Sequence, residues 1–300
     1  MQITSIFGII SKKERTHVME RAVFTEEKEI KKEVKRFERY LKREEASKNT
    51  NVSYCWTLNY YLSTYHFISN ENLRLYKAYL MDNFTPSTVN QRIQAMNKYI
   101  KWYNYRGIQT LKSVKIQQKP FLENVISMQD YLFLKKRLKK SEDLTDYFLI
   151  WVMGCTGARI SEVLQMKVEN IIDGQVDFYG KGKKSRRIYF IKAFQTEAIE
   201  WLSSIDRKSG HVFLNSDGKN MTEKGVEKHL KTLAKKYGIE ECVMYPHSFR
   251  HMFGKAFYDK EKDLPLLADI MGHSSLETTR IYTRKSAQEQ RQIIEKTVRW

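Results

Sequence analysis

The chain has 300 residues, of which 41% are hydrophobic and 29% are charged, with 4 prolines and 13 glycines. This length exceeds the usual size of one domain, so we expect two domains, and the composition is that of a helix-rich folded protein and excludes wholesale disorder. Lys and Arg outnumber Asp and Glu by 53 to 35, a net charge of +18, which favours a polyanionic partner, with nucleic acid first and an anionic membrane surface second.

Cysteine usage and the amino-terminal segment indicate where the protein works. Cys55, Cys155 and Cys242 are widely spaced and form no Cys-x-x-Cys motif, so we expect neither a disulfide framework nor a zinc knuckle. The apolar residues 3–10 lack the flanking features of a signal peptide, and no run approaches the roughly 20 apolar residues that span a bilayer. We therefore expect a cytoplasmic protein with no membrane partner.

Helical periodicity dominates residues 25–110. In the first predicted helix the apolar side chains recur every three or four positions, at Ile30, Val34, Phe37 and Leu41. Further helices are expected at residues 52–67 and 71–81, and a fourth from the Thr85-Pro86 pair, which is typical of a helix start. These helices predict one compact all-α domain. Three of its basic side chains could grip DNA phosphates: Arg92, Lys98 and Lys101.

A second domain is expected after a linker. Residues 111–124 are polar and basic without sustained periodicity, whereas helical patterns return from residue 125. Alternating residues at 175–179 and 186–191 predict two short strands with a basic tip between them, which contains Lys181, Lys183 and Lys184. Helices then continue to residue 284, and a tail helix is expected over residues 285–300. The predicted fold is thus mainly α with a small antiparallel β-sheet, and residues 1–24 form an extension.

Arg159 is the first candidate for phosphate chemistry. It follows Thr156-Gly157-Ala158, a turn that brings the guanidinium to the start of a helix, where an oxyanion is favoured. The ordinary alternative is a surface ion pair with Glu162, three residues further along the same helix.

His247 and Arg250 are three residues apart, so on a helix they share a face and can converge on one phosphate. His247 and His251 have the spacing of a zinc pair, but the Glu of the His-Glu-x-x-His motif is missing, so a metal site is the minor interpretation. The Gly-Lys-Gly at 180–182 lacks the rest of a phosphate-binding P-loop, which argues against ATP. We expect no metal and no cofactor.

His273 and Tyr282 lie near the carboxyl end, nine residues apart. An isolated Tyr on such a helix is usually a half-buried packing residue. The order and spacing of the other motifs favour a chemical role instead.

The motifs resemble those of one family when they are taken together. Their order along the chain is Thr-Gly-Ala-Arg-Ile-Ser-Glu at 156–162, Gly-Lys-Gly at 180–182, His-Ser-Phe-Arg-His at 247–251, Gly-His at 272–273 and Tyr282. This order resembles the tyrosine recombinase (phage integrase) family, in its two-domain, Xer-like or transposon-linked type. The resemblance covers residues 125–284. It implies an all-α, SAM-like core-binding domain at residues 25–110, followed by an α+β catalytic domain.

The resemblance also implies a reaction. Tyr282 would attack a DNA phosphodiester and form a 3'-phosphotyrosine bond, without metal or ATP. Arg159 and Arg250 would clamp the phosphate oxygens, assisted by His247 or His273.

Proton transfer would use two further groups. The resemblance implies that His247 accepts the phenolic proton and that Lys181, between the two glycines, protonates the departing 5'-oxygen. Lys183 and Lys184 are the neighbouring lysines, and we expect them to contact DNA. Glu162 would hold Arg159 or a neighbouring group in orientation, although an ordinary solvated helix pair is equally compatible with the sequence. His251 would have a structural or supporting role.

Assembly is implied as well. In the family, two protomers bind inverted half-sites on double-stranded DNA as a homodimer, and two dimers pair into a homotetramer. The tail after Tyr282 would pack on a neighbouring protomer or dock on its own. Residues 1–24 are too short for the separate arm-binding domain of some phage integrases.

Three alternatives remain open. A type IB topoisomerase uses a similar constellation without paired sites, and junction formation between two duplexes would distinguish it. A noncatalytic DNA-binding regulator could keep the fold without the activity. A metal-dependent nuclease would lose activity with a chelator.

Overall fold

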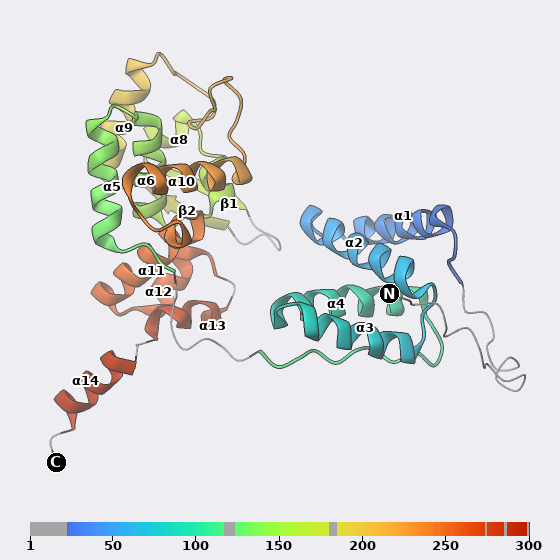
Figure 1. Cartoon of the computed structure of the whole chain (residues 1–300). Coiled ribbons are helices and arrows are strands. Elements are labelled where there is room, and N and C mark those ends of the chain that lie inside the picture. The colour runs from blue at the N-terminus through green and yellow to red at the C-terminus, as the bar shows by residue number, and fades with distance from the viewer. Residues whose placement is uncertain (1–22, 117–123, 180–184, 274, 285–286, 299) are drawn as a thin grey trace, which may run out of the picture. The chain divides into compact units, whose positions relative to one another are not determined.

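The computed structural model describes residues 23–116, 124–179, 185–273, 275–284, 287–298 and 300 (Figure 1). Contacts divide the chain into two compact units, Met1–Gln118 and Lys119–Trp300, and each has its own hydrophobic core. The boundary falls inside the segment that the sequence predicted as a linker. The predicted fold class, mainly helical with a small antiparallel sheet, is confirmed.

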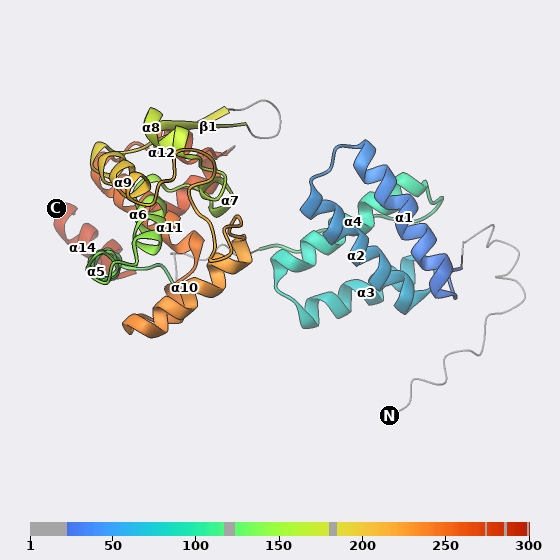
Figure 2. The ribbon, with the colours of Figure 1, turned by 90° about the horizontal axis from the view of Figure 1, so that it is seen from above.

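The described residues of the first unit, 23–116, form four helices, namely α1 (Glu27–Arg43), α2 (Lys48–Tyr65), α3 (Asn70–Asn83) and α4 (Pro86–Tyr103), which Figure 2 shows side by side. Helix α2 packs against α1 and α4, and α3 packs against α4. Each helix agrees with the sequence prediction to within a few residues at its ends, where capping rather than periodicity decides the boundary. Ser47 and Ser69, for example, accept hydrogen bonds from the first turns of α2 and α3.

The core of this unit includes one buried acid. Glu33 is 4% exposed, and its carboxylate accepts hydrogen bonds from Tyr99 Oη (3.1 Å) and Arg36 Nη1 (2.6 Å). The Tyr99 ring in turn meets Phe37 edge to face. A buried carboxylate needs such partners, because an unpaired charge in an apolar core is strongly destabilising.

The second unit holds the two strands and the remaining helices. In chain order its elements are α5 (Met128–Lys140), α6 (Leu144–Thr156), α7 (Ile160–Val163), α8 (Val168–Asp173), β1 (Gln175–Tyr179), β2 (Ser185–Tyr189), α9 (Lys192–Ser204), α10 (Glu223–Tyr237), η2 (Glu241–Val243), α11 (Pro246–Glu261), α12 (Leu264–Met271), α13 (Leu276–Thr279), η3 (Arg280–Thr283) and α14 (Ala287–Thr297). Within the described parts of the chain, no helix is both long and apolar enough to cross a membrane.

Helix α6 forms the centre of the second unit. All its residues from 147 to 154 are buried, which is the pattern of a helix surrounded by protein rather than of an amphipathic surface helix. It packs against α5, α9 and α11. Its end at Gly157, in a left-handed conformation, turns the chain toward Arg159.

The strands β1 and β2 pair antiparallel, with Val176 opposite Ile188 and Phe178 opposite Arg186. Since side chains alternate along a strand, Arg186 and Ile188 point to the same face. Both are buried, at 7% and 3% exposure. An arginine therefore occupies an inward position of this small sheet.

Gly154 lets α5 and α6 pack closely. A Cβ at this position would lie 2.4 Å from the ring of Tyr131 on α5. We predict that Gly154→Ala lowers the free energy of unfolding of the second unit by about 1–3 kcal/mol through overpacking. Denaturant unfolding followed by circular dichroism measures this. A rise of about 1 kcal/mol, the gain in helix propensity alone, would contradict the close contact.

Candidate active site

Three arginines meet at the carboxyl end of α12. The last carbonyls of a helix lack partners within it and carry partial negative charge, so they attract guanidinium groups. Three consecutive carbonyls here each accept from one arginine of a different element, Arg186 Nε to Ile270 O (2.8 Å), Arg250 Nη2 to Met271 O (2.6 Å) and Arg159 Nη2 to Gly272 O (3.1 Å). We call Arg159, Arg186 and Arg250 the arginine cluster.

Two glycines make this approach possible. Gly157 ends α6 and Gly272 ends α12, both with positive φ, which a residue with a side chain rarely adopts. A Cβ on Gly272 would lie 2.4 Å from Arg186 Cδ. The carbonyl of Gly157 accepts hydrogen bonds from Arg250 Nη1 and, at 3.4 Å, from Arg186 Nη2. Both helix ends therefore serve as acceptors for the cluster.

Glu162 links two members of the cluster. Its Oε1 accepts from Arg159 Nη1 (2.9 Å), and its Oε2 accepts from the backbone N–H of Arg159 (2.8 Å) and from Arg186 Nη1. The residue is 9% exposed. Burial alone would raise the pKa of Glu162, but the two guanidiniums and the backbone N–H together lower it. The carboxylate is thus a buried anion shared by two cations, unlike an ordinary solvated helix pair.

Arg250 is the most buried member, at 3% exposure. Burial, with the like charges of Arg186 and Arg159, lowers the pKa of Arg250 to about 10, which still leaves it charged at neutral pH. The cluster is therefore a concentration of positive charge held inside the protein.

The ring of His273 is oriented by two partners. Arg250 Nη2 lies 2.9 Å from Nε2 of His273, and Nδ1 lies 2.8 Å from Thr279 Oγ1. Because a guanidinium only donates, Nε2 accepts and the ring proton belongs to Nδ1. Burial and the charges of Arg250, Arg159 and Arg186 lower the pKa of His273 to about 4. His273 is therefore neutral in the free protein.

Tyr282 lies in the same part of the second unit. It belongs to η3, is 1% exposed, and packs in a small apolar cluster with Leu267 and Met271 of α12. Gly254 on α11 leaves room for its ring, since a Cβ there would lie 2.6 Å from Tyr282 Cζ. Burial raises the pKa of Tyr282 to about 12, although Arg250 and Arg159 oppose this. The phenol is thus protonated at neutral pH.

His251, rather than His247, contacts the phenol. Nδ1 of His251 lies 3.1 Å from Tyr282 Oη, whereas the His247 ring is 6.1 Å from the His251 ring, measured between centroids. Burial, with His247 and Arg250, lowers the pKa of His251 to about 4. Partial burial and the charges of Arg250 and Arg159 also lower the pKa of His247, which remains exposed. One turn of α11 therefore carries both imidazoles, His247 facing solvent and His251 facing Tyr282.

Six of the basic residues predicted from the sequence do not belong to the arginine cluster. Lys181, Lys183 and Lys184 lie outside the described residues. In the first unit, the guanidinium of Arg92 is stacked 4.4 Å from the ring centroid of Trp56 and 3.9 Å from that of Phe84. Two further basic residues predicted to contact DNA lie on the same helix, Lys98, which pairs with Glu44 (3.0 Å), and the exposed Lys101.

Arg186 was not among the residues predicted from the sequence to form the site. The predicted basic residues of this region were the lysines at 181, 183 and 184 that precede it. A signal was present, because Arg186 is in phase with the inward-facing Ile188 in a period of two. A charged residue in phase with a buried strand position needs a partner, and the sequence alone did not identify it.

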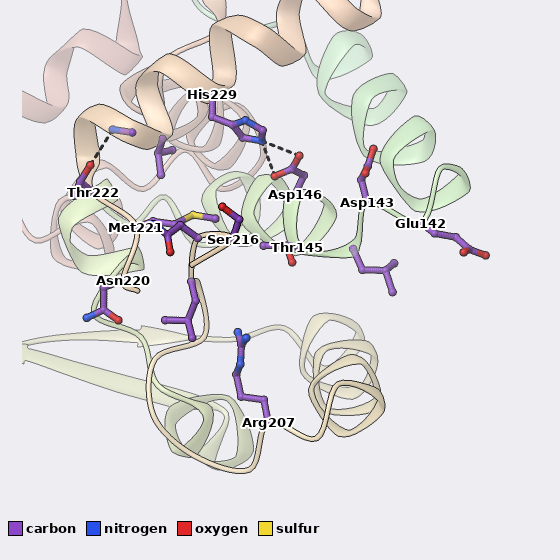
Figure 3. A pocket seen from close by; sticks show the side chains of 15 residues that line it. Glu142, Asp143, Thr145, Asp146, Arg207, Ser216, Asn220, Met221, Thr222 and His229 are labelled. Carbon is purple, nitrogen blue, oxygen red and sulfur yellow. Dashed lines mark hydrogen bonds and ion pairs between the residues drawn. The ribbon is translucent and has the colours of Figure 1, made fainter. Parts of the chain in front are cut away.

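A separate cavity of about 730 Å³ lies in the same unit, between the amino-terminal ends of α6 and α10 (Figure 3). Its wall includes Asp146, whose two oxygens lie 2.9 and 2.8 Å from His229 Nε2. This hydrogen bond raises the pKa of His229, although burial opposes it. The cavity contributes no residue to the arginine cluster. Across the described ranges, no group of three or more His, Cys, Asp or Glu side chains gathers in a way that could hold a metal ion.

Known proteins share both the sequence pattern and the fold. Residues 124–289, more than half of the chain, match the model of the phage integrase family. The tyrosine recombinase XerA of Pyrococcus furiosus is 28% identical over 280 residues, which cover 90% of this chain and 96% of XerA. The tyrosine recombinase XerC of Lactobacillus delbrueckii subsp. bulgaricus is 25% identical over 236 residues, or 74% of this chain and 80% of XerC.

Solved structures agree on the fold. The XerH site-specific recombinase bound to its difH substrate in a pre-cleavage complex matches with a TM-score of 0.63 and 22% identity, over 90% of this chain and 84% of XerH. The Tn1549 transposon integrase with a circular intermediate DNA matches with a TM-score of 0.65 and 15% identity, over 92% of this chain and 100% of that one. The family match, supported by these relatives, shows that the chain belongs to the phage integrase family and is a tyrosine site-specific recombinase.

Proposed function

We propose that this recombinase cleaves and rejoins double-stranded DNA through a 3'-phosphotyrosine intermediate at Tyr282, without metal or ATP. The observation that carries the proposal is the arginine cluster, which gathers positive charge in the unit that also holds Tyr282. The net charge of +18 supports a polyanionic substrate. XerH and the Tn1549 integrase, which share the fold, are both bound to DNA in their structures.

Arg159 and Arg250 would hold the scissile phosphate. A guanidinium has five N–H donors in a planar fork. In its contacts with other described residues, Arg159 uses two of them, one to Glu162 and one to Gly272. Its side chain is 39% exposed, so the remaining donors can reach a phosphate that arrives from solvent. Arg250, which is more deeply buried than Arg159, would add positive charge on the protein side of the phosphate. Both would stabilise the negative charge that builds on the nonbridging oxygens in the transition state.

The chemical step would exchange one phosphoester for another. Tyr282 Oη would form a bond to phosphorus as the bond between phosphorus and the 5'-oxygen breaks, which leaves a 3'-phosphotyrosine and a free 5'-hydroxyl. The phenolic proton leaves with a base, and the 5'-oxygen gains a proton from an acid. A 5'-hydroxyl from another strand reverses these steps and rejoins the DNA. The ester energy is retained, so no nucleotide hydrolysis is required.

Proton transfer from Tyr282 would involve α11. In the free protein the phenol is buried against His251, so it must move before a DNA phosphate can reach it. We propose that His247, on the exposed side of the helix, accepts the proton in the DNA complex, while His251 holds the ring beforehand. The negative charge of the phosphate would raise the pKa values of His247 and His273, which allows either to donate a hydrogen bond to it.

Further roles fall to lysines that lie outside the described residues and to basic residues of the first unit. Lys181 would protonate the departing 5'-oxygen. Five basic residues would contact the DNA backbone, Arg92, Lys98, Lys101, Lys183 and Lys184. Two protomers would bind inverted half-sites as a homodimer, and two dimers would pair as a homotetramer.

Tyr282→Phe tests the nucleophile. We expect this variant to bind DNA normally but to form no covalent adduct, because only the phenolic oxygen is removed. The measurement is a denaturant-resistant protein–DNA band on fragments that flank the encoding gene, with a chelator present and ATP omitted.

The matched control is Tyr258→Phe, which alters another tyrosine of the same apolar cluster on α11 and should keep the adduct. An adduct that persists in Tyr282→Phe, or that disappears from the unmodified protein when the chelator is added, would overturn the proposal.

Lys181→Ala tests the acid. Cleavage should slow about 100-fold or more on an ordinary phosphodiester, because the 5'-oxygen would leave without a proton. A substrate with 5'-sulfur at the scissile bond should restore the rate, since a thiolate leaves unprotonated. Single-turnover cleavage at saturating DNA measures both. Lys183→Ala and Lys184→Ala are the controls, and recovery by sulfur in one of them instead would move the acid to that lysine.

The pH dependence of cleavage tests the base. With the pKa of Tyr282 raised to about 12, the phenolate fraction grows about tenfold per pH unit across the neutral range. His247→Gln should therefore lose about 100-fold in cleavage rate near pH 7 and recover as the pH rises. His251→Gln should lose less of the cleavage rate, and its rate should depend less steeply on pH than that of His247→Gln. A larger loss with alkaline recovery in His251→Gln would assign the proton to that residue.

A further inference from the structure

Arg186 is the member of the arginine cluster to which the proposed chemistry gives no task. It is 7% exposed, and each of its three guanidinium nitrogens donates a hydrogen bond. We infer that Arg186 is a positioning residue that holds Arg159 in its reactive orientation through the shared carboxylate of Glu162. This inference rests on the proposed function.

The contacts of Arg186 reach three different elements. Nε donates to Ile270 O of α12 (2.8 Å), Nη1 donates to Glu162 Oε2 of α7, and Nη2 lies 3.4 Å from Gly157 O at the end of α6. A planar fork with donors on three sides can satisfy these acceptors at once, whereas a lysine offers one compact ammonium. Arg186 therefore joins three segments that are distant in sequence.

Glu162 passes this restraint to Arg159. The carboxylate has two oxygens, and Arg186 occupies Oε2 together with the backbone N–H of Arg159. Oε1 then faces Arg159 Nη1 at 2.9 Å. Arg186 and this backbone N–H together fix the plane of the carboxylate, and with it the direction from which Arg159 is held. Without Arg186, the single N–H would hold Oε2, so the carboxylate would have more freedom to rotate and Arg159 would follow.

Arg186 also sets the charge of the pair. Glu162 carries one negative charge. If Arg159 were its only partner, the two charges would cancel. With two guanidiniums on one carboxylate, the group keeps a net positive charge toward an incoming phosphate. The charged groups around Glu162 are Arg159 from α7, Arg186 from β2 and Arg250 from α11. A phosphate would therefore meet a cationic site rather than a neutralised one.

Arg186 further ties strand β2 to this site. It pairs with Phe178 across the hairpin, and it stands two residues after Lys184 in the sequence. The described part of β2 is therefore anchored at its second residue to the end of α12 and to Glu162.

A double-mutant cycle tests the inference. The variants are Arg186→Met, Glu162→Gln and their combination, with Arg186→Lys to retain charge without the fork. The probe is the DNA fragment on which the unmodified protein forms its Tyr282 adduct fastest. Cleavage is followed in single turnover at saturating DNA, and DNA affinity and thermal unfolding are measured separately.

The matched control is Arg187→Met. Arg187 is the next residue of the same strand, but its side chain is exposed and forms a two-bond pair with Asp177 (2.8 Å for each bond). This variant should leave the cleavage rate unchanged.

We expect Arg186→Met to slow cleavage about 100-fold, because small displacements of a catalytic group have effects of this size. DNA affinity should fall far less, because it is shared among many phosphate contacts of which the lost charge affects one. Arg186→Lys should lose about tenfold, since the ammonium restores charge but not the three-sided anchor. Once Glu162 is Gln, Arg186→Met should cost little more, because both variants break the same link.

Three results would overturn the inference. They are an Arg186→Met rate equal to that of Arg187→Met, additive losses in the cycle, and a loss that tracks only the folded fraction. If Arg186→Met does not fold, Arg186→Lys and Glu162→Gln decide the matter, because a purely structural arginine predicts normal cleavage in whichever of them folds. Absence of a Tyr282-dependent adduct in the unmodified protein would instead refute the proposed function.

Discussion

The last carbonyls of α12 are the acceptors on which the candidate site depends. The turn at Gly272 pairs the carbonyls of residues 268 and 269 with backbone N–H groups, but those of residues 270–272 need other donors, and three guanidiniums provide them, one for each carbonyl. The donors come from β2, α11 and the start of α7. Because each arginine donates to at least one backbone carbonyl, the positions of the charges follow in large part from the fold itself.

This arrangement concentrates like charges, and it affects the protonation states of the acid and the imidazoles around it. Glu162 is an acid that bridges two members of the arginine cluster, and His273 and His251 are kept neutral by burial and neighbouring positive charge. In the proposed reaction, the negative charge that builds on the phosphate would act as a further counterion for the arginine cluster. Its arrival would relieve repulsion among the arginines and raise the proton affinity of the imidazoles, so binding and activation would be coupled by electrostatics.

The buried phenol adds a conformational element. Tyr282 is packed among apolar side chains and against Gly254, with its hydroxyl on His251 rather than toward solvent. As the proposed nucleophile, Tyr282 would be protected by this packing from other phosphates, and its exposure would be a step that DNA binding could control.

The sequence by itself determined the helices, the hairpin and the identity of most candidate residues, because periodicity, capping and the order of motifs are local properties. It placed the strand at residues 175–179 and the arginine at the start of α7. Only the tertiary structure decided which side chains meet. Arg159 and Gly272 are 113 residues apart, Arg186 and Glu162 are 24 apart, and His251 and Tyr282 are 31 apart. Local patterns specify which face of an element is buried, but not which distant acceptor it will find, and so the role of Arg186 and the contact between His251 and Tyr282 became visible only in the folded chain.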